Sequence, residues 1–199
     1  MTTTKQLAGQ EWKAHWGLVL ACSFGWSLST LVSHSIGLFM GPIGDELGWS
    51  RAQISSGMII IALSTIVLSP LGGAMVDRWG SRRLAIPGIT LTAMVIASYG
   101  IVQSVPMWLG LWSLYALVSI GVKLTVWTSA ASNAFTAGRG LAVAATISGT
   151  AFTGVFAPPI ANWLIDSFGW RHAYMLLAAG WGSIALLLAI VFLFEPYDP

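Results

Sequence analysis

The residues with the clearest chemistry lie in one short charged run between two apolar stretches. An aspartate is followed by three arginines, with a glycine on either side of the aspartate: Gly73-Ala74-Met75-Val76-Asp77-Arg78-Trp79-Gly80-Ser81-Arg82-Arg83. On a helix Asp77 lies one turn after Gly73, where its carboxylate can accept hydrogen bonds from a neighbouring helix start or pair with an arginine. Gly80 permits a chain reversal, and arginines are costly in hydrocarbon. The run predicts a cytoplasmic hairpin between two membrane helices, which we call the charged loop (residues 77–83).

Two further basic residues, His34 and Lys123, lie inside long apolar stretches, where a polar group is costly unless it faces water or a partner. A histidine binds a carboxylate when it is protonated and releases it when neutral, so His34 is a candidate substrate ligand. The alternative is a hydrogen bond to a neighbouring helix or a place at the wet outer edge. Lys123 would attract an anion if it faced a cavity, and its alternative is snorkelling to the cytoplasmic interface.

The composition is that of an integral membrane protein. Hydrophobic residues make up 56% of the chain, charged residues only 8%, and the mean hydropathy is +0.77. A net charge of +2 is too small to indicate nucleic-acid binding. Cys22 is the single cysteine, which excludes an internal disulfide and a cysteine metal cage.

No enzyme chemistry is evident in the sequence. It contains no HExxH motif, no cysteine pair, no clustered carboxylates and no nucleophile beside a base. The histidines His15, His34 and His172 fall at different membrane levels, so their spacing does not predict a metal site. We therefore expect no enzyme and no cofactor, with a proton as the candidate coupling ion.

Polar residues divide the chain into six apolar segments, each close to the roughly 20 residues that a membrane helix needs. The predicted fold is all-α, with spans over Trp16–Met40, Ile54–Val76, Leu84–Val102, Met107–Ser129, Leu141–Ile165 and Ala173–Phe194. Ser50 and Gln53 form a capping-box pattern before the second span. Pro158 and Pro159 predict a kink or a break in the fifth span.

The distribution of lysine and arginine predicts the orientation. If both termini are cytoplasmic, six basic residues lie inside and two outside; those inside are Lys5, Lys13, Arg78, Arg82, Arg83 and Arg139. Arg51 and Arg171 lie outside, and Lys123 lies in the membrane. Basic residues are retained on the cytoplasmic side of membrane proteins, so we expect this arrangement, in a bacterial inner (plasma) membrane.

The spacing G-x-x-x-D-R-x-G-x-R-R resembles the loop between the second and third transmembrane helices of the major facilitator superfamily of secondary transporters. Other runs resemble its monocarboxylate and oxalate/formate branch; they are residues 35–40, residues 47–55, Gly138-Arg139-Gly140-Leu141-Ala142 and Phe168-Gly169-Trp170-Arg171. The resemblance implies a six-helix amino-terminal half built as two three-helix inverted repeats. It also implies that Arg139 belongs to an inward gate, although topology alone accounts for an arginine there. His34 corresponds to a position where animal monocarboxylate transporters carry a lysine.

The predicted spans divide the chain into a cytoplasmic tail (residues 1–15), a six-helix domain (residues 16–194) and a carboxyl-terminal tail (residues 195–199). A full facilitator has twelve spans and holds its substrate between two halves, so we expect either pairing with a second half, including a homodimer, or a truncated product. The leading hypothesis is a carrier in the lipid bilayer that moves a small organic anion by alternating access with a proton. The alternative is a six-helix assembly subunit without transport.

Overall fold

The computed structural model describes residues 4–193, and its regular structure is helical throughout. The helices are α1 (Thr4–Leu47), α2 (Arg51–Trp79), α3 (Ser81–Ser98), α4 (Val105–Val118), α5 (Leu124–Ala134), α6 (Arg139–Ile147) and α7 (Gly149–Phe192). Two 3₁₀ segments, η1 (Tyr99–Ile101) and η2 (Ser119–Val122), continue α3 and α4. No strand occurs among the described residues, which confirms the all-α prediction. The predicted tail at residues 195–199 lies outside the described residues.

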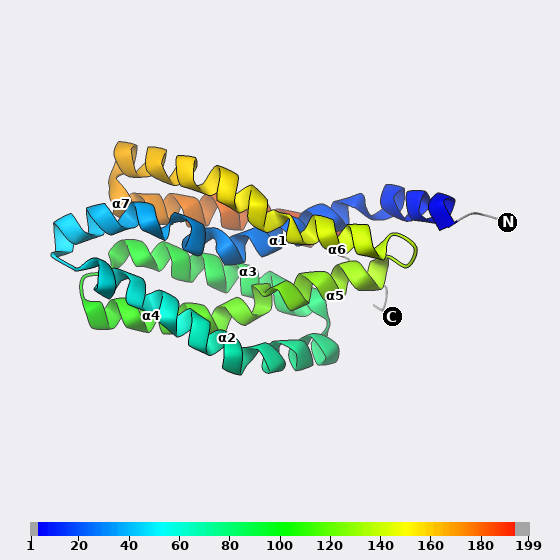
Figure 1. Ribbon diagram of the computed structural model, residues 1–199, viewed down its shortest axis with the longest axis horizontal. Helices are drawn as coiled ribbons and strands as arrows, with labels where there is room; N and C mark the ends of the chain where they lie inside the picture. The colour runs from blue at the N-terminus through cyan, green and yellow to red at the C-terminus, as the bar shows by residue number, and fades with distance from the viewer. Residues whose placement is uncertain (1–3, 194–199) are drawn as a thin grey trace.

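Five stretches of the described chain are long and apolar enough to cross a membrane, and the last of them, Arg139–Phe192, contains the predicted fifth span and all but the last two residues of the sixth. Within α7 the backbone leaves helical values at Gly169, where φ is 78° and ψ is 159°. Figure 1 shows that the chain reverses within α7, so that its yellow and orange segments lie side by side. The predicted boundary between the fifth and sixth spans therefore falls at a real change of direction.

The fourth span is not the continuous helix that we predicted. Helix α4 ends at Val118, the 3₁₀ segment η2 follows, and Lys123 is extended (φ −67°, ψ 158°) before α5 begins at Leu124. A Cβ atom on Gly121 would lie 2.7 Å from the carbonyl oxygen of Leu84 and 2.8 Å from the Cα of Gly88. The prediction failed because this close approach of α3 depends on tertiary packing, and glycine also weakens a helix locally.

Of the kink or break predicted at Pro158 and Pro159, a break is absent. Helix α7 runs through both prolines, and its backbone departs from helical values at Gly169 instead. Proline fixes φ close to the helical value, so it removes a hydrogen bond without forcing the chain out of the helix. A left-handed φ, in contrast, ends a helix and is readily adopted by glycine.

The start of α2 confirms the predicted capping box. The backbone N–H of Gln53 donates to the Ser50 hydroxyl (3.2 Å), and the Ser50 N–H donates to the Gln53 side-chain oxygen (2.9 Å). At the other end of α2, Gly80 adopts φ 80° and ψ 163°, and its N–H donates to the Val76 carbonyl (2.9 Å). Both contacts satisfy helix-end groups that hydrocarbon could not.

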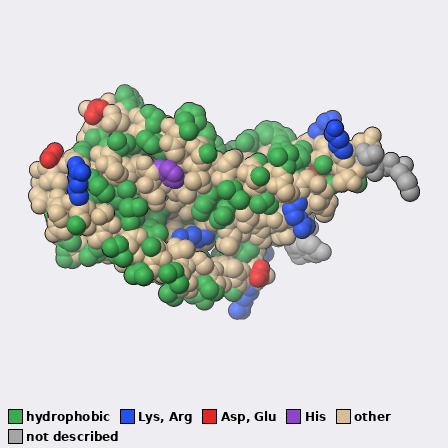
Figure 2. Space-filling model, viewed as in Figure 1, with side chains coloured by type: hydrophobic (Ala, Val, Ile, Leu, Met, Phe, Trp, Pro, Cys, Tyr) green, Lys and Arg blue, Asp and Glu red, His purple; other side chains and the backbone are tan. Residues whose placement is uncertain are grey.

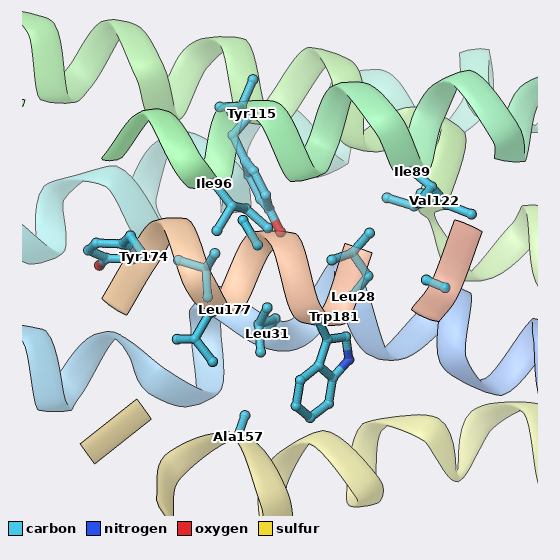
Figure 3. Close-up of a cluster of buried hydrophobic side chains, with 14 of the residues drawn as sticks. Leu28, Leu31, Ile89, Ile96, Tyr115, Val122, Ala157, Tyr174, Leu177 and Trp181 are labelled. Carbon is cyan, nitrogen blue, oxygen red and sulfur yellow. The ribbon is translucent and has the colours of Figure 1, made fainter. Parts of the chain in front are cut away.

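The core joins α1, α3, α4 and both segments of α7. Figure 3 shows buried side chains that converge from these helices, among them Leu28, Leu31, Ile89, Ile96, Tyr115, Ala157, Tyr174, Leu177 and Trp181. Polar atoms in the core bond across helices: the Tyr115 hydroxyl donates to the Ser29 carbonyl (2.9 Å), and the Trp181 indole donates to the Ser27 hydroxyl (2.7 Å). These bonds fix the rotation of α1 against α4 and α7, because buried donors need partners.

At the end of the molecule opposite the charged loop, Arg171 ties three segments together. Its Nε donates to the Glu46 carboxylate (2.9 Å), and its Nη1 donates to the carbonyls of Gly100 (3.0 Å) and Val102 (2.8 Å). The Trp170 indole also donates to Glu46 (2.6 Å). We call these five residues the Arg171 clamp. It joins the ends of α1 and η1 to the second segment of α7.

We expect Arg171→Ala to lower the free energy of unfolding by about 2 kcal/mol, because it leaves the carbonyls of buried Gly100 and Val102 without their donor. Thermal unfolding of the detergent-solubilised protein, followed by tryptophan fluorescence, measures this loss. The matched control is Arg51→Ala, at the same end, since Arg51 forms no hydrogen bond or ion pair with any described residue. Equal loss in both variants would contradict the prediction.

The same clamp predicts a pH dependence. Glu46 lies beyond the apolar part of α1, and its hydrogen bonds from Arg171 and then Trp170 lower the pKa of its carboxyl. A depressed pKa adds stability that is complete above the ordinary carboxyl value and is lost as pH falls below it. The difference in free energy of unfolding between wild type and Arg171→Ala should therefore become smaller as the pH falls below the ordinary pKa of a glutamate carboxyl.

Candidate anion site

The main polar hollow lies between α1, α2 and the break before α5. Its volume is about 360 Å³, within the range of small-molecule sites. Its polar lining consists of Ser29, Thr30 and Ser33 from α1, Thr65 and Ser69 from α2, and Lys123 and Thr125 beside the break. We call it the Lys123 hollow. Figure 2 shows a basic side chain (blue) within a hollow near the middle of the face that it draws, between hydrophobic patches (green).

Two positive elements meet in the Lys123 hollow. The Lys123 ammonium donates to the Thr65 hydroxyl (3.1 Å), which in turn donates to the Ile61 carbonyl (2.8 Å). An ammonium has three donors, so this contact leaves capacity for an anion. Lys123 is also the N-cap of α5 and provides no side-chain cap, and Leu124 and Thr125, the first residues of that helix, line the hollow. The first amides of a helix carry partial positive charge, so ammonium and helix start together suit a carboxylate.

His34 lies beside the Lys123 hollow but does not line it. Its Nδ1 lies 2.9 Å from the Thr30 carbonyl, so Nδ1–H donates there and Nε2 is left for another group. The imidazole is exposed and faces α7, since a Cβ atom on Gly154 would lie 3.6 Å from Nε2. The structure thus places His34 next to Ser33, which lines the hollow, without bringing its imidazole into the lining around Lys123.

The charged loop adjoins a second hollow of about 290 Å³ between α2 and α5. Gly73 and Asp77 line it together with Ser129, and Thr125 lines both this hollow and the Lys123 hollow. The Asp77 carboxylate is exposed and forms no hydrogen bond or ion pair with a described residue. In the part of the chain that the structure describes, nothing comes within 4 Å of a Cβ atom built on Gly73. No other helix therefore packs closely against Gly73 within residues 4–193.

Arg139, which the resemblance assigns to an inward gate, and the arginines of the charged loop have separate contacts. The Arg78 guanidinium lies 5.9 Å from the centre of the Trp79 ring, and Arg139 Nε donates to the Phe135 carbonyl (3.1 Å) at the start of α6. Arg82 and Arg83 also interact with other groups. Arg139 thus bonds to the loop before its own helix, and the described contacts do not join it to the charged loop.

Thr65 and Ser33, which line the Lys123 hollow, were missed by the sequence analysis. Thr65 and Ser69 are four residues apart in an apolar span, so they share one helix face, and this spacing was an available signal. Thr30 and Thr125 also line the hollow. Ser27 instead donates to the Phe24 carbonyl (2.7 Å) within its own helix.

The fold and the hollow define a helical membrane protein with a site suited to a small anion. Residues 16–199 match the Major Facilitator Superfamily. The chain is 30% identical over 193 residues to the oxalate:formate antiporter of Oxalobacter formigenes, and the match covers 94% of this chain and 44% of that protein. It is 29% identical over 175 residues to monocarboxylate transporter 11 of Mus musculus, with coverages of 82% and 37%. It is 30% identical over 204 residues to monocarboxylate transporter 11 of Homo sapiens, with coverages of 92% and 40%.

The chain therefore belongs to the Major Facilitator Superfamily, as the charged-loop motif predicted. The chain spans less than half the length of these relatives. The relatives are transporters by name, so the chain belongs to a family of transporters and not of enzymes. The branch suggested by the sequence also agrees with the relatives, which are monocarboxylate transporters and an oxalate:formate antiporter.

Proposed function

We propose that this chain forms one side of the substrate path of a secondary transporter for a small organic anion such as a monocarboxylate. The observation that carries the proposal is the meeting of the Lys123 ammonium with the uncapped start of α5 in one hollow. Discontinuous helices whose starts face a carboxylate are a recurring feature of secondary transporters. The names of the relatives, which include oxalate, formate and monocarboxylate, support the same substrate class.

We further propose six membrane crossings arranged as two inverted three-helix repeats. The charged loop, Asp77-Arg78-Trp79-Gly80-Ser81-Arg82, has a counterpart in Asp166-Ser167-Phe168-Gly169-Trp170-Arg171. Gly80 and Gly169 have nearly the same backbone conformation, with φ of 80° and 78° and ψ of 163° and 159°. A repeated sequence with a repeated conformation at opposite ends of the molecule supports an inverted duplication.

The proposed orientation places the charged-loop end and both termini in the cytoplasm. Figure 1 shows that the turn between α2 and α3 lies at the same end of the molecule as the starts of α1 and α6, while the start of α2 and the reversal within α7 lie at the other end. The first end carries Lys13, Arg82, Arg83 and Arg139, and the second carries Arg51 and Arg171. This grouping agrees with retention of basic residues inside the cell. Labelling of a Gly140→Cys variant on a Cys22→Ser background with a membrane-impermeant reagent from either side tests it, because Gly140 is exposed at the same end and nothing in the described chain comes within 4 Å of a Cβ atom there. Labelling only from outside would reverse the assignment.

Alternating access in this proposal requires a second six-helix domain, in the same polypeptide or in another, that closes the open side of the hollow. The exposed Asp77 carboxylate, with no partner among residues 4–193, supports such a docking contact because anions pair well with helix starts. A homodimer is one form of this arrangement. Cross-linking of the purified chain in detergent distinguishes it from a monomer.

The test of the site is ligand binding followed by uptake. Formate, oxalate and lactate should each be titrated against the purified chain, because a bound anion raises the unfolding temperature in proportion to the logarithm of its concentration. Uptake of the labelled anion into vesicles, with and without an inward proton gradient, then tests transport and proton coupling. Absence of stabilisation by all three anions would overturn the assigned substrate class.

We expect His34→Ala to reduce anion uptake by about threefold, less than substitutions in the Lys123 hollow, because Nε2 offers a single contact outside the lining. His34→Gln is the matched variant, since its amide keeps a hydrogen-bond donor. Initial rates of labelled formate uptake at equal protein levels measure the effect. Equal rates in His34→Ala and wild type would remove His34 from the substrate path.

A further inference from the structure

The first segment of α1, residues 4–14, is docked against the loop between α5 and α6. It is separated from the rest of α1 by non-helical backbone at His15 (φ −123°, ψ 15°). The Trp12 ring lies 5.4 Å from the Phe135 ring, and the His15 ring lies 5.8 Å from it. Phe135 is fully buried, and Trp12 packs with it against Val19. The polar segment before the first span therefore has a defined place on the charged-loop end.

The Glu11 carboxylate of this segment binds the backbone of the loop. One oxygen accepts the backbone N–H groups of Thr136 (3.1 Å) and Ala137 (3.0 Å) and the Thr136 hydroxyl, while the other accepts the Gly138 N–H (2.8 Å). Successive amides that converge on one anion form a concave anion-binding site, here occupied by the chain's own carboxylate. The Thr136 hydroxyl and these amides lower the pKa of Glu11 to about 2, so the carboxylate stays ionised even in acid that protonates an ordinary glutamate.

The loop that Glu11 holds leads in both directions to elements of the transport path. It follows the end of α5, whose other end begins at Lys123, and it precedes Arg139, the first residue of α6. Arg139 Nε donates back to the carbonyl of Phe135 (3.1 Å). The position of the loop therefore sets the position of α5, and so of the helix start in the Lys123 hollow.

We propose that Glu11 is a positioning residue for transport, which fixes the α5–α6 loop and thereby limits the movement of α5. This role rests on the proposed function, because it acts on the helix that forms the anion site. Release of the carboxylate from its four donors frees the loop at the charged-loop end. Glu11→Gln removes the charge and weakens the contact, whereas Glu11→Asp keeps the charge on a shorter side chain.

Amide hydrogen exchange of the full chain in detergent tests the contact without any substrate. In Glu11→Gln the amides of residues 136–138 should exchange at least about tenfold faster than in wild type, with a smaller increase in Glu11→Asp. Asp45→Asn is the matched control, because Asp45 is an exposed carboxylate at the opposite end of α1 with no bond to a described residue. Unchanged exchange in Glu11→Gln would overturn the proposal.

Uptake kinetics test the positioning role separately. Glu11→Gln should raise the half-saturating anion concentration several-fold, because the helix start that faces the anion is no longer held in place, and Glu11→Asp should restore part of the affinity. An unchanged half-saturating concentration in Glu11→Gln would overturn the positioning role. If wild type binds none of the tested anions while exchange at residues 136–138 still rises in Glu11→Gln, the proposed function fails and the contact stands.

Discussion

Lys123→Gln is expected to lower anion uptake at least about tenfold, because a charge-assisted hydrogen bond contributes roughly 1.5–3 kcal/mol and each 1.4 kcal/mol is a factor of ten. Glutamine retains a donor to the Thr65 hydroxyl, so the variant removes the charge with little change of the hollow's shape. Stabilisation of the protein by formate or oxalate should be lost in parallel. The measurements are uptake of labelled anion into vesicles and the ligand-dependent unfolding temperature.

Two variants make this result specific. Lys123→Arg keeps the positive charge beside the start of α5 and should retain a large part of the binding, although its planar fork will not reproduce the single bond to Thr65. Lys13→Gln removes a charge from the first segment of α1 and should leave uptake unchanged. Equal uptake in Lys123→Gln and wild type would mean that the lysine lies at the membrane interface without binding substrate, as the alternative interpretation of the sequence held.

The parts of the fold that the sequence predicts are those with local signals. The charged loop and the capping box at Ser50 follow from residue types at fixed spacing, and the boundary between the fifth and sixth spans follows from polar residues between apolar segments; the structure has each of them. Long apolar segments likewise predict membrane helices, because hydrocarbon forces backbone groups to bond within a helix. The family assignment also follows from such a local motif, the spacing of Gly73, Asp77 and Gly80.

The candidate site depends on contacts between distant residues, and the sequence could not predict those. The helix breaks before Lys123 because Gly121 lies against the backbone of α3. The sequence does not show this contact, so Lys123 was expected inside a helix, whereas it is the N-cap of α5. Its partner Thr65 lies 58 residues earlier in the chain. Glu11 and Glu46 belong to no sequence motif. Their partners, the loop at residues 136–138 for Glu11 and Arg171 for Glu46, are distant in the chain and contact them only in the folded protein. Local patterns therefore predict the helices, and tertiary contacts determine the site.

The second large effect on stability is expected where α1 packs against α7. Gly149→Ala should lower the free energy of unfolding by about 3 kcal/mol, which is in the upper part of the usual range for overpacking. A Cβ atom at Gly149 would overlap the carbonyl oxygen of Ser23 and lie 2.9 Å from its carbonyl carbon. These are backbone atoms, so no side-chain rotation relieves the contact. In thermal unfolding of the detergent-solubilised protein, the midpoint should fall by roughly 10 °C, since each kcal/mol shifts a domain of this size by about 2–4 °C.

The matched control is Gly180→Ala in the second segment of the same helix, because nothing in the described chain comes within 4 Å of a Cβ atom there. Alanine favours a helix over glycine by up to about 1 kcal/mol, so this variant should be neutral or slightly more stable. The opposite signs separate a steric clash from a general response of α7 to alanine. The Ser23 hydroxyl, which donates to the Ala145 carbonyl (2.8 Å), joins α1 to α6 at the same level. Displacement of α1 by the Gly149→Ala side chain should therefore also strain its bond to α6. An unchanged free energy of unfolding in Gly149→Ala would show that α1 and α7 do not pack this closely.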